Sequence, residues 1–418
     1  MNMLSVQQTE TLILNAVQPF TAVQDSEAVV LADARDRILA DVVTSPLDFP
    51  HWDNSAMDGY AVRYADVQTC SADQPITLKI VEEIPAGYQP RQTVQAGQAA
   101  RILTGSVMPA GADTVVMQED TQRQGDRVTI LAAPKPHAFV RQRAAYYRAG
   151  NPLLTTGTVL HAAEIAILAA AQCTRVAVYR RPRVAILSTG SELVPVDQPL
   201  QPGQIVDSNQ YALAALVAQC GAEPIRLGIV PDQPAALKTA IAQAIATADV
   251  VLSSGGVSVG DYDYVDAILA ELGAQIHCRS VAIKPGKPLT FATFPPSATA
   301  HRPTLYFGLP GNPVSALVTF WRFVHPALGK LSGLPQDWGP ILVRARTRQA
   351  VRSDGKREAY FWGRLQMIDG SYEFELAGGN HSSGNLINLA GTNGLAILPV
   401  GQTHLDSGET VSVLRMDS

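Results

Sequence analysis

Three loops rich in glycine and proline lie between residues 249 and 315, and each follows a short apolar run. They read SSGGVSVGDYDY (253–264), KPGKP (284–288) and LPGNPVSAL (309–317). Glycine lets a backbone approach a ligand closely, and successive N–H groups in such loops bind anions. Because two lysines and an aspartate stand in the same loops, we expect a site for an anionic, phosphate-bearing ligand.

The two lysines of KPGKP are expected to present fixed positive charge. Pro285 and Pro288 restrict the backbone, so Lys284 and Lys287 are suited to holding an oxyanion. The alternative is that Lys284 pairs with a carboxylate and Lys287 faces water. In LPGNPVSAL the backbone should matter most, because Asn312 or Pro313 would begin a helix whose positive end points at the pocket.

Carboxylates follow three strands of the same expected sheet. Glu192 lies in STGSEL (188–193), Asp232 in VPD (230–232) and Asp261 in the first glycine loop. Together they could hold Mg²⁺ against ligand phosphates, although each alone is also typical of a helix cap. Asp207, in GQIVDSN (203–209), is open between a cap and a ligand contact. Asp58, followed by Gly59, indicates an ordinary turn on spacing alone.

Several other chemistries lack their motifs in this sequence. There is no GxxxxGK[ST] and no GxGxxG, and the eight histidines show neither HxxxH nor HExxH spacing. We find no basis for a Ser-His-Asp set. Only His381 stands beside a glycine and serine loop (378–384). The four cysteines form no CxxC, which argues against a zinc site or a disulfide scaffold and indicates a reducing compartment.

Composition bounds the class of protein. The chain has 418 residues, 46% of them hydrophobic and 17% charged, as expected for about three globular domains. The net charge of −5 comes without a basic tract, so no nucleic-acid partner is expected. No apolar run reaches the roughly 18 residues of a membrane span, and the N-terminus lacks the build of a signal peptide. We therefore expect no membrane association and a cytoplasmic location.

The periodicity predicts how these residues are positioned. From residue 183 strands alternate with helices, which favours a mostly parallel α/β sheet. Its strands are expected at 184–187, 225–230, 250–252, 276–283 and 305–309, and its helices at 209–220, 234–246, 265–272 and 314–328. Helices are also expected at 5–17 and 27–34. The predicted domains are a mixed domain (1–45 and 145–180), an inserted β-rich domain (46–144), the α/β domain (181–330) and a C-terminal β domain (331–418).

The motifs, taken in order, resemble those of the molybdopterin molybdenumtransferase family, often called MoeA and related to the gephyrin E domain. The specific motifs are NSAMDGYAV (54–62), RILTGSVMPAGADTVVMQE (101–119), STGSEL, GQIVDSN, SSGGVSVGDYDY, AIKPGKPLTF (282–291) and LPGNPVSAL. Weaker matches are GKREAYFWGRL (355–365) and SSG (382–384). The resemblance runs over nearly the whole chain.

The resemblance implies a multidomain α/β plus β fold. A central, mostly parallel sheet of the molybdopterin-binding type would be joined by an inserted β-rich domain, a mixed N-terminal domain and a C-terminal β-barrel-like module. It implies a homodimer that inserts molybdate into adenylylated molybdopterin and releases AMP, with Mg²⁺ required. Molybdopterin adenylyltransferase and molybdenum-enzyme maturation proteins would be further partners.

The resemblance also implies roles for individual residues. Lys284, Lys287, Asp58, Asp261 and Glu192 would be catalytic, with Asp58 reaching across the dimer into a shared cleft. The metal would be held by Glu192, Asp232 and Asp261. The substrate would contact a larger set: Thr104, Ser188, Thr189, Gly190, Asp207, Ser254, Gly255, Gly256, Ser258, Pro310, Gly311, Asn312, Pro313, Ser315, Ser382 and Ser383.

One segment departs from the family pattern. Residues 140–150 read VRQRAAYYRAG, so Ala144, Ala145 and Tyr146 stand where the family has Gly-Glu-Asp. A tyrosine, with a pKa near 10, does not replace a carboxylate as a Mg²⁺ ligand. Two alternatives therefore stay open: a molybdopterin-binding scaffold or carrier without catalysis, and a molybdopterin adenylyltransferase.

Overall fold

The computed structural model describes residues 3–255, 262–296 and 301–416, and it consists of two compact units. Unit 1 comprises Met1–Asp41, Gly157–His161 and Ala177–Ser418, and unit 2 comprises Val42–Thr156 and Ala162–Val176. The predicted four-domain division is not tested by this partition and stays a prediction. Within the described ranges, no helix combines the length and apolar character needed to cross a bilayer.

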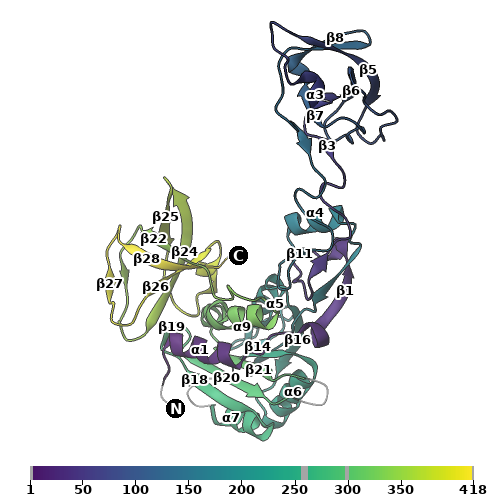
Figure 1. Cartoon of the computed structure of the whole chain (residues 1–418). Helices are drawn as coiled ribbons and strands as arrows, with labels where there is room; N and C mark the ends of the chain where they lie inside the picture. Colours follow the sequence, from purple (N-terminus) through teal and green to yellow (C-terminus); the bar gives the residue numbers. More distant parts are fainter. Residues whose placement is uncertain (1–2, 256–261, 297–300, 417–418) are drawn as a thin grey trace. The chain divides into compact units, whose positions relative to one another are not determined.

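Unit 1 is built on a six-stranded sheet (Figure 1). Four strands are parallel neighbours, in the spatial order β16 (Glu223–Val230), β13 (Arg183–Thr189), β17 (Val250–Ser254) and β21 (Thr304–Leu309). Two strands complete it: β20 (Pro288–Phe294) pairs antiparallel with β21, and β18 (Gln275–Ser280) pairs antiparallel with β20 at the edge. This confirms the predicted mostly parallel sheet, but β20 was not predicted.

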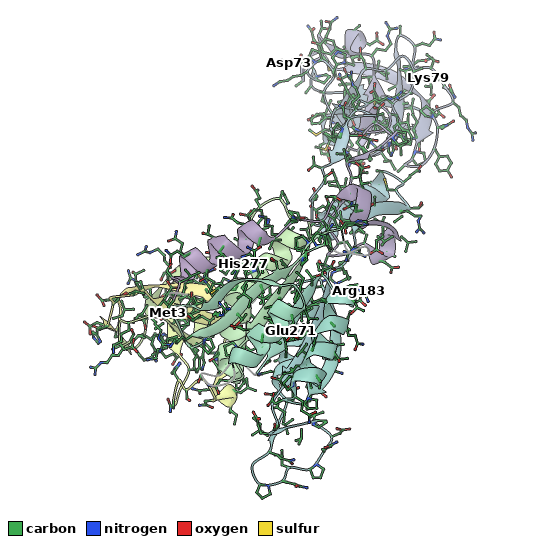
Figure 2. The ribbon with its side chains drawn as sticks, turned by 90° about the horizontal axis from the view of Figure 1, so that it is seen from below. Met3, Asp73, Lys79, Arg183, Glu271 and His277 are labelled. Atoms are coloured by element: carbon green, nitrogen blue, oxygen red, sulfur yellow. The ribbon has the colours of Figure 1, made fainter. Side chains whose placement is uncertain are left out.

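Alternation along the central strands explains the layers. Val184 and Ile186 of β13 pack in one core with α5 (Asn209–Gln219), whereas Ala185 and Leu187 pack in another with α6 (Pro234–Thr247). Successive side chains of a strand point to opposite faces, so a strand buried on both faces is apolar throughout. Helix α7 (Tyr262–Glu271), whose last residue is labelled in Figure 2, covers the same face as α6, and a Lys238–Glu271 ion pair links the two helices.

The N-terminal helix α1 (Val6–Ala16) packs in the first of these cores. A capping box begins it, since the Ser5 hydroxyl accepts from the Gln8 N–H and the Gln8 side chain accepts from the Ser5 N–H. The helix predicted at 27–34 is wrong. That segment forms β1 (Ser26–Val30) and a 3₁₀ turn, η1 (Leu31–Asp33), because the valine pair suits extended backbone.

Other elements of unit 1 connect the sheet to its surroundings. The helical run after β21 consists of α8 (Pro313–Thr319), a π-helical turn η3 (Phe320–Val324) and α9 (His325–Leu331). It is longer than the helix predicted at 314–328. The remaining short elements are α2 (Ala22–Asp25), β14 (Leu193–Val194) and β15 (Ile205–Val206). Strand β12 (Arg175–Tyr179) begins in unit 2 and ends in unit 1.

The C-terminal part of unit 1 is a closed five-stranded barrel. Its strands run in the order β24 (Glu358–Ile368), β25 (Ser371–Leu376), β22 (Leu342–Thr347), β28 (Thr410–Arg415) and β26 (Gly394–Leu398), and β26 pairs again with β24. Strands β23 (Val351–Arg352) and β27 (His404–Leu405) form a small separate ribbon, and η4 (Leu386–Leu389) precedes β26. Trp362 of the barrel shares one hydrophobic core with Phe320 and Phe323, so barrel and sheet pack together.

One strand was predicted as longer than it is. The segment 276–283 splits at Ser280, and the short β19 (Ile283–Lys284) leaves the sheet to pair with barrel strand β24. The loop KPGKP therefore begins on the barrel and returns to the sheet at β20.

Unit 2 contains a second six-stranded sheet, which agrees with the predicted inserted β-rich domain. Its order is β7 (Thr114–Met117), β4 (Gly59–Val62), β6 (Gln98–Ile102), β5 (Ile76–Ile84), β9 (Arg127–Ile130) and β8 (Thr121–Gln124). Short ladders join β10 (Val140–Arg141) to β3 (Asn54–Ser55) and β11 (Pro152–Leu154) to β2 (Val43–Thr44). The helical elements are α3 (Tyr64–Val67), η2 (Gln118–Asp120) and α4 (Ala162–Ala170).

Candidate functional site

A cavity of about 680 Å³ opens where the parallel strands of unit 1 end. Its size is typical of a small-molecule site, and the carboxyl edge of a parallel sheet is where such ligands bind. Residues that follow β13, β16, β17 and β21 line it, together with the start of β20 and part of the 378–384 loop. They include Ser188, Thr189, Gly190, Glu192, Asp207, Asn209, Asp232, Ser254, Gly255, Pro288, Pro310, Gly311, Asn312, Pro313, Ser315 and Gly384.

Most of the substrate-contacting residues predicted in unit 1 are thus brought together at one cavity. Lys284, Lys287, Ser382 and Ser383 are not among its lining residues. Gly256, Ser258 and Asp261 lie outside the described residues.

Two hydroxyl groups in the cavity wall lack a partner among the residues that the structure describes. Ser188 and Thr189 are buried, and neither Oγ of Ser188 nor Oγ1 of Thr189 has a hydrogen-bond partner among the described residues. Buried polar groups are nearly always satisfied in native proteins, so an unpaired pair at a cavity indicates a ligand or water that completes them.

Glycine is required where two of the loops meet. Gly255 has a φ of +90°, and a Cβ there would lie 2.1 Å from the carbonyl oxygen of Thr189. A Cβ on Gly311 would in turn lie 3.5 Å from the Cα of Gly255. The loops after β13, β17 and β21 therefore pack backbone against backbone at the cavity.

Asn209 holds these loops together, and sequence reasoning missed it. Its Nδ2 donates to Ser254 Oγ at 2.6 Å and to the Gly311 carbonyl at 2.8 Å. The residue is buried and begins helix α5. Its place at the end of GQIVDSN was the available signal, but the partners are 45 and 102 residues away along the chain.

Asp207 makes the capping contact that the sequence left open, and its role as a ligand contact stays a prediction. Its Oδ1 accepts the Gln210 N–H at 3.2 Å in the first turn of α5, as a capping residue does. It is also buried and lines the cavity. The cap therefore places the carboxylate at the site.

Two of the three predicted metal ligands line the cavity. Glu192 and Asp232 are both lining residues, and Oδ2 of Asp232 accepts the Ser191 N–H at 3.1 Å. Throughout the described parts of the chain, no three His, Cys, Asp or Glu side chains gather closely enough to hold a metal by themselves. Two carboxylates on one cavity suit Mg²⁺, which is commonly held by one or two carboxylates plus substrate phosphates.

The KPGKP loop reaches the cavity through Pro288. Lys284 points to the barrel, where its Nζ lies 3.1 Å from Oδ2 of Asp354. Lys287 is exposed, and its carbonyl accepts the Val281 N–H at 3.0 Å. The ion pair is the arrangement that the sequence left as an alternative, and the predicted oxyanion role of both lysines stays a prediction.

The loop between β25 and η4 closes one side of the cavity. Asn312 is the N-cap of α8 and Pro313 its first residue, as predicted. Asn312 Nδ2 donates to Ser383 Oγ at 3.1 Å, and the Val314 N–H donates to the Ser383 carbonyl at 3.1 Å. These contacts bring Gly384 to the cavity wall.

His381 belongs to this loop, and its ring packs against the barrel. Its Nε2 lies 3.0 Å from the Ala377 carbonyl, and its ring centroid lies 4.4 Å from that of Trp362. Burial lowers the pKa of His381, because the charged imidazolium is poorly solvated there. Its ring therefore supports the loop in the neutral form.

Asp58 and Thr104 are paired in unit 2. Oδ1 of Asp58 accepts both the Thr104 N–H and the Thr104 hydroxyl, each at 2.7 Å. These two hydrogen bonds lower the pKa of Asp58 and keep it ionised. The next residue has to be glycine, because a Cβ at Gly59 would lie 2.0 Å from the Val116 carbonyl oxygen. The turn that the spacing indicated thus presents an ionised carboxylate.

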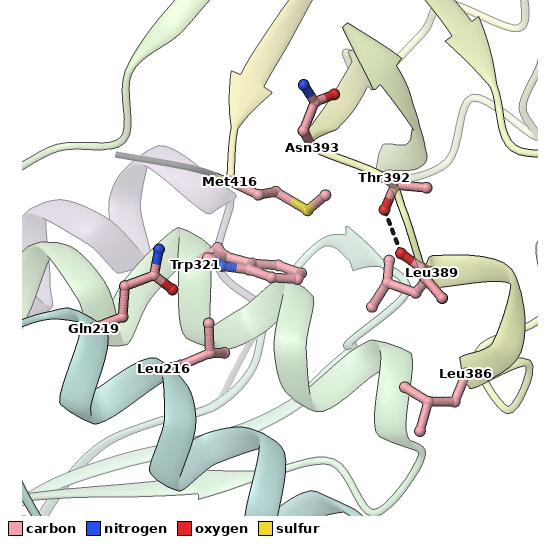
Figure 3. Close-up of a pocket in the computed structure, with 9 residues that line it drawn as sticks. Leu216, Gln219, Trp321, Leu386, Leu389, Thr392, Asn393 and Met416 are labelled. Carbon is pink, nitrogen blue, oxygen red and sulfur yellow. Dashed lines mark hydrogen bonds between the residues drawn. The ribbon is translucent and has the colours of Figure 1, made fainter.

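A second cavity of unit 1, of about 370 Å³, has a different character (Figure 3). It lies between α5, η3 and η4 and contains no charged lining residue; Leu216, Trp321, Leu389 and Met416 surround it. The Thr392 hydroxyl is engaged with the Leu389 carbonyl at 2.6 Å. Such a lining cannot select a phosphate, so the cavity at the sheet edge is the candidate site.

Comparisons with known proteins match this architecture along the chain. Three family models align in order: MoeA N-terminal region (domain I and II) over residues 4–171, probable molybdopterin binding domain over 185–330, and MoeA C-terminal region (domain IV) over 344–416. The molybdopterin molybdenumtransferase of Nostoc sp. is 64% identical over 99% of this chain and 94% of its own length. The chain belongs to the molybdopterin molybdenumtransferase family.

Other relatives agree with this assignment. The molybdopterin molybdenumtransferase of Haemophilus influenzae is 35% identical over 98% of both chains. The crystal structure of the molybdopterin biosynthesis moeA protein from Pyrococcus horikoshii superposes with a TM-score of 0.83 at 28% identity, over 99% of this chain and all of that one. These matches confirm the predicted fold class and place the chain among the transferases of molybdenum cofactor biosynthesis.

The departure from the family pattern lies on the surface of unit 2. Tyr146 is 72% exposed, and its N–H donates to the Phe49 carbonyl at 2.9 Å. Ala144 adopts a φ of +62°, a conformation that side chains rarely adopt. The segment is therefore an ordered turn in which an exposed phenol stands where the family resemblance led us to expect a carboxylate.

Proposed function

We propose that the chain inserts molybdate into adenylylated molybdopterin and releases AMP and the molybdenum cofactor. The observation that carries the proposal is the cavity at the carboxyl edge of β13, β17 and β21, where the buried hydroxyls of Ser188 and Thr189 lack a partner among the described residues. The names of the relatives support a molybdenum transfer to molybdopterin, the adenylylated substrate and AMP release are what the family resemblance implies, and the cavity's glycine loops suit a phosphate-bearing substrate.

The residues of the cavity would act by positioning and by electrostatics. The hydroxyls of Ser188 and Thr189 would donate to the substrate phosphates, and the backbone around Gly255 and Gly311 would approach them closely. Lys284 and Lys287 would supply positive charge for molybdate and the pyrophosphate linkage. No side chain needs to form a covalent bond, because oriented donors and charges stabilise the charge that develops in phosphoryl chemistry.

Mg²⁺ fits this proposal through Glu192 and Asp232, with Asp261 as a further ligand. When bound, the ion would neutralise phosphate charge. The chain's own contribution would be to orient Asp232, whose carboxylate is fixed by the Ser191 N–H.

We further propose a cytoplasmic homodimer in which Asp58 and Thr104 of a second copy complete each site. Support comes from the family resemblance and from Asp58 being held ionised by Thr104. Mixing inactive Asp58→Ala with inactive Lys284→Ala protein tests the arrangement. Random exchange of subunits should restore roughly a quarter of the activity, because half of the dimers then carry one intact site. No recovery after verified exchange would contradict a shared site.

The reaction itself is tested by measuring AMP release and cofactor formation from adenylylated molybdopterin and molybdate, with and without Mg²⁺. We expect turnover that depends on both. A folded protein that gives no turnover beyond the uncatalysed rate would refute the proposal. If Tyr146→Asp then restored turnover, the missing carboxylate would be the cause.

The exposed Tyr146 favours one second candidate, a molybdopterin-binding scaffold or carrier. Tight binding of the substrate without AMP release would identify it. An adenylyltransferase acting one step earlier is disfavoured, since the N- and C-terminal regions also match family models of MoeA. ATP consumption with molybdopterin would nevertheless single it out. Molybdopterin adenylyltransferase and maturation proteins of molybdenum enzymes are proposed as the partners that precede and follow this step.

A further inference from the structure

The first lysine of KPGKP is built into the barrel. Strand β19 pairs in parallel with β24, so that Ile283 lies opposite Glu358 and Lys284 opposite Ala359. The Glu358 N–H donates to the Ala282 carbonyl at 2.9 Å, and Nη1 of Arg357 donates to the Ile283 carbonyl at 3.2 Å. The backbone of Lys284 is therefore positioned by the start of β24 and by Arg357 just before it.

That same barrel segment presents a carboxylate to the lysine. Asp354 Oδ2 lies 3.1 Å from Lys284 Nζ, while its Oδ1 accepts the Lys356 N–H at 3.0 Å. The turn is held by a further bond from the Gly355 N–H to Ser353 Oγ at 2.9 Å. The hydrogen bond from Lys356, then the one from Lys284, lower the pKa of Asp354. Asp354 is thus an ionised group fixed in place before any ligand arrives.

We propose that Asp354 is a specificity-determining residue: its carboxylate occupies Lys284 as a built-in anion, and an incoming substrate must displace it. This inference rests on the proposed function, because that function assigns an oxyanion to Lys284.

The exposure of the pair makes displacement feasible. The side chains of Lys284 and Asp354 are 46% and 37% exposed, and exposed ion pairs are weak. When a free oxyanion such as phosphate or sulfate displaces Asp354, the ion pair with Lys284 is the only interaction that it gains. A substrate already held in the cavity by several groups presents its anion at high effective concentration, so it displaces the carboxylate more readily. Asp354 therefore favours the pyrophosphate linkage of a substrate already held in the cavity over every free small anion, molybdate included.

The test uses sulfate and phosphate as probes on the full chain at constant ionic strength. Asp354→Asn keeps the shape of the side chain and removes its charge. We expect both probes to bind about two- to five-fold more tightly to this variant, the range that an exposed ion pair is worth. Binding is measured by calorimetry or by the shift of the melting temperature. Asp354→Asn combined with Lys284→Met should lose the gain, because the cation that binds the probe is then absent.

Glu373→Gln is the matched control. Glu373 forms an exposed ion pair with Arg348 in the same barrel, so the variant changes the net charge equally. Sulfate binding by Glu373→Gln should match the wild type. The inference is overturned if Asp354→Asn binds the probes like the wild type, if Glu373→Gln gains as much affinity, or if the double variant keeps the gain.

The experiment separates failure of this inference from failure of the proposed function. Probe binding needs no turnover, so a chain that releases no AMP can still show the gain in Asp354→Asn, and the inference then stands without the activity. Conversely, full activity with unchanged probe binding would remove the role of Asp354 and leave the proposed function intact.

Discussion

Replacing Gly255 by alanine should destabilise the sheet and its site through two separable effects. Gly255 has a φ of +90°, and a residue with a side chain costs about 1–2 kcal/mol in left-handed backbone. Its Cβ would also lie 2.1 Å from the Thr189 carbonyl oxygen, so the backbones must move apart. Overpacking of this kind costs about 1–3 kcal/mol. The sum is about 2–5 kcal/mol.

Gly228→Ala is the matched control in the same sheet. Gly228 has a φ of +85° but nothing within 4 Å of its Cβ position, so only the backbone term applies. One kcal/mol shifts the melting temperature by about 2–4 °C in a domain of 150–250 residues. We therefore expect a decrease of about 2–8 °C for Gly228→Ala and about 4–20 °C for Gly255→Ala.

Circular dichroism during heating, supported by urea midpoints, measures both variants against the wild type. Gly255→Ala should also bind inorganic phosphate more weakly, because Thr189 lies in the cavity wall. If Gly255→Ala melted at the same temperature as Gly228→Ala, the inference that the β13 and β17 loops pack closely would be refuted. The account of the site as three loops packed backbone against backbone would then fail.

Three further predictions concern individual side chains. Lys284→Ala should lower kcat/KM more than about tenfold, or about 1.4 kcal/mol, yet cost no more than about 1 kcal/mol of stability, as expected for a surface ion pair. A large loss of melting temperature would instead indicate a structural role. Asn209→Ala should cost about 1–3 kcal/mol in urea unfolding, since two hydrogen bonds from its Nδ2 are lost. A cost in unfolding free energy that is indistinguishable from zero would contradict the role of Asn209 in holding the two loops together. Burial lowers the pKa of His381, so its contribution to stability is complete above about pH 6.5 and declines as the pH falls through the folded-state pKa. His381→Asn should remove this part of the pH dependence, and identical pH profiles for the two proteins would refute it.

Much of the site could be predicted from local sequence. The glycine loops after β13, β17 and β21 were located correctly, because an apolar β-branched run followed by glycine and a helix is a local pattern. The start of α8 at Asn312 and Pro313 was likewise predicted, since capping depends on neighbouring residues. Family motifs added Asp58 and Thr104, whose pairing no periodicity indicates.

Some local patterns were misread. The alternating segment 288–294 was not recognised as strand β20, although it pairs with β18 and β21. The segment 27–34 was predicted as a helix, but Val29 and Val30 are the last two residues of strand β1. In both cases β-branched or aromatic residues favoured extended backbone over the assigned state.

The sequence by itself determined which elements form and which loops face the carboxyl edge of the sheet, because hydrophobic period and capping act over a few residues. Tertiary structure alone decided which side chains meet. Asn209 contacts Gly311 across 102 residues, and Lys284 meets Asp354 across 70. Such contacts depend on how separate elements pack, and a short motif carries no record of a partner so distant. The family resemblance placed Lys284 at the site, but only the folded chain shows which carboxylate it pairs with.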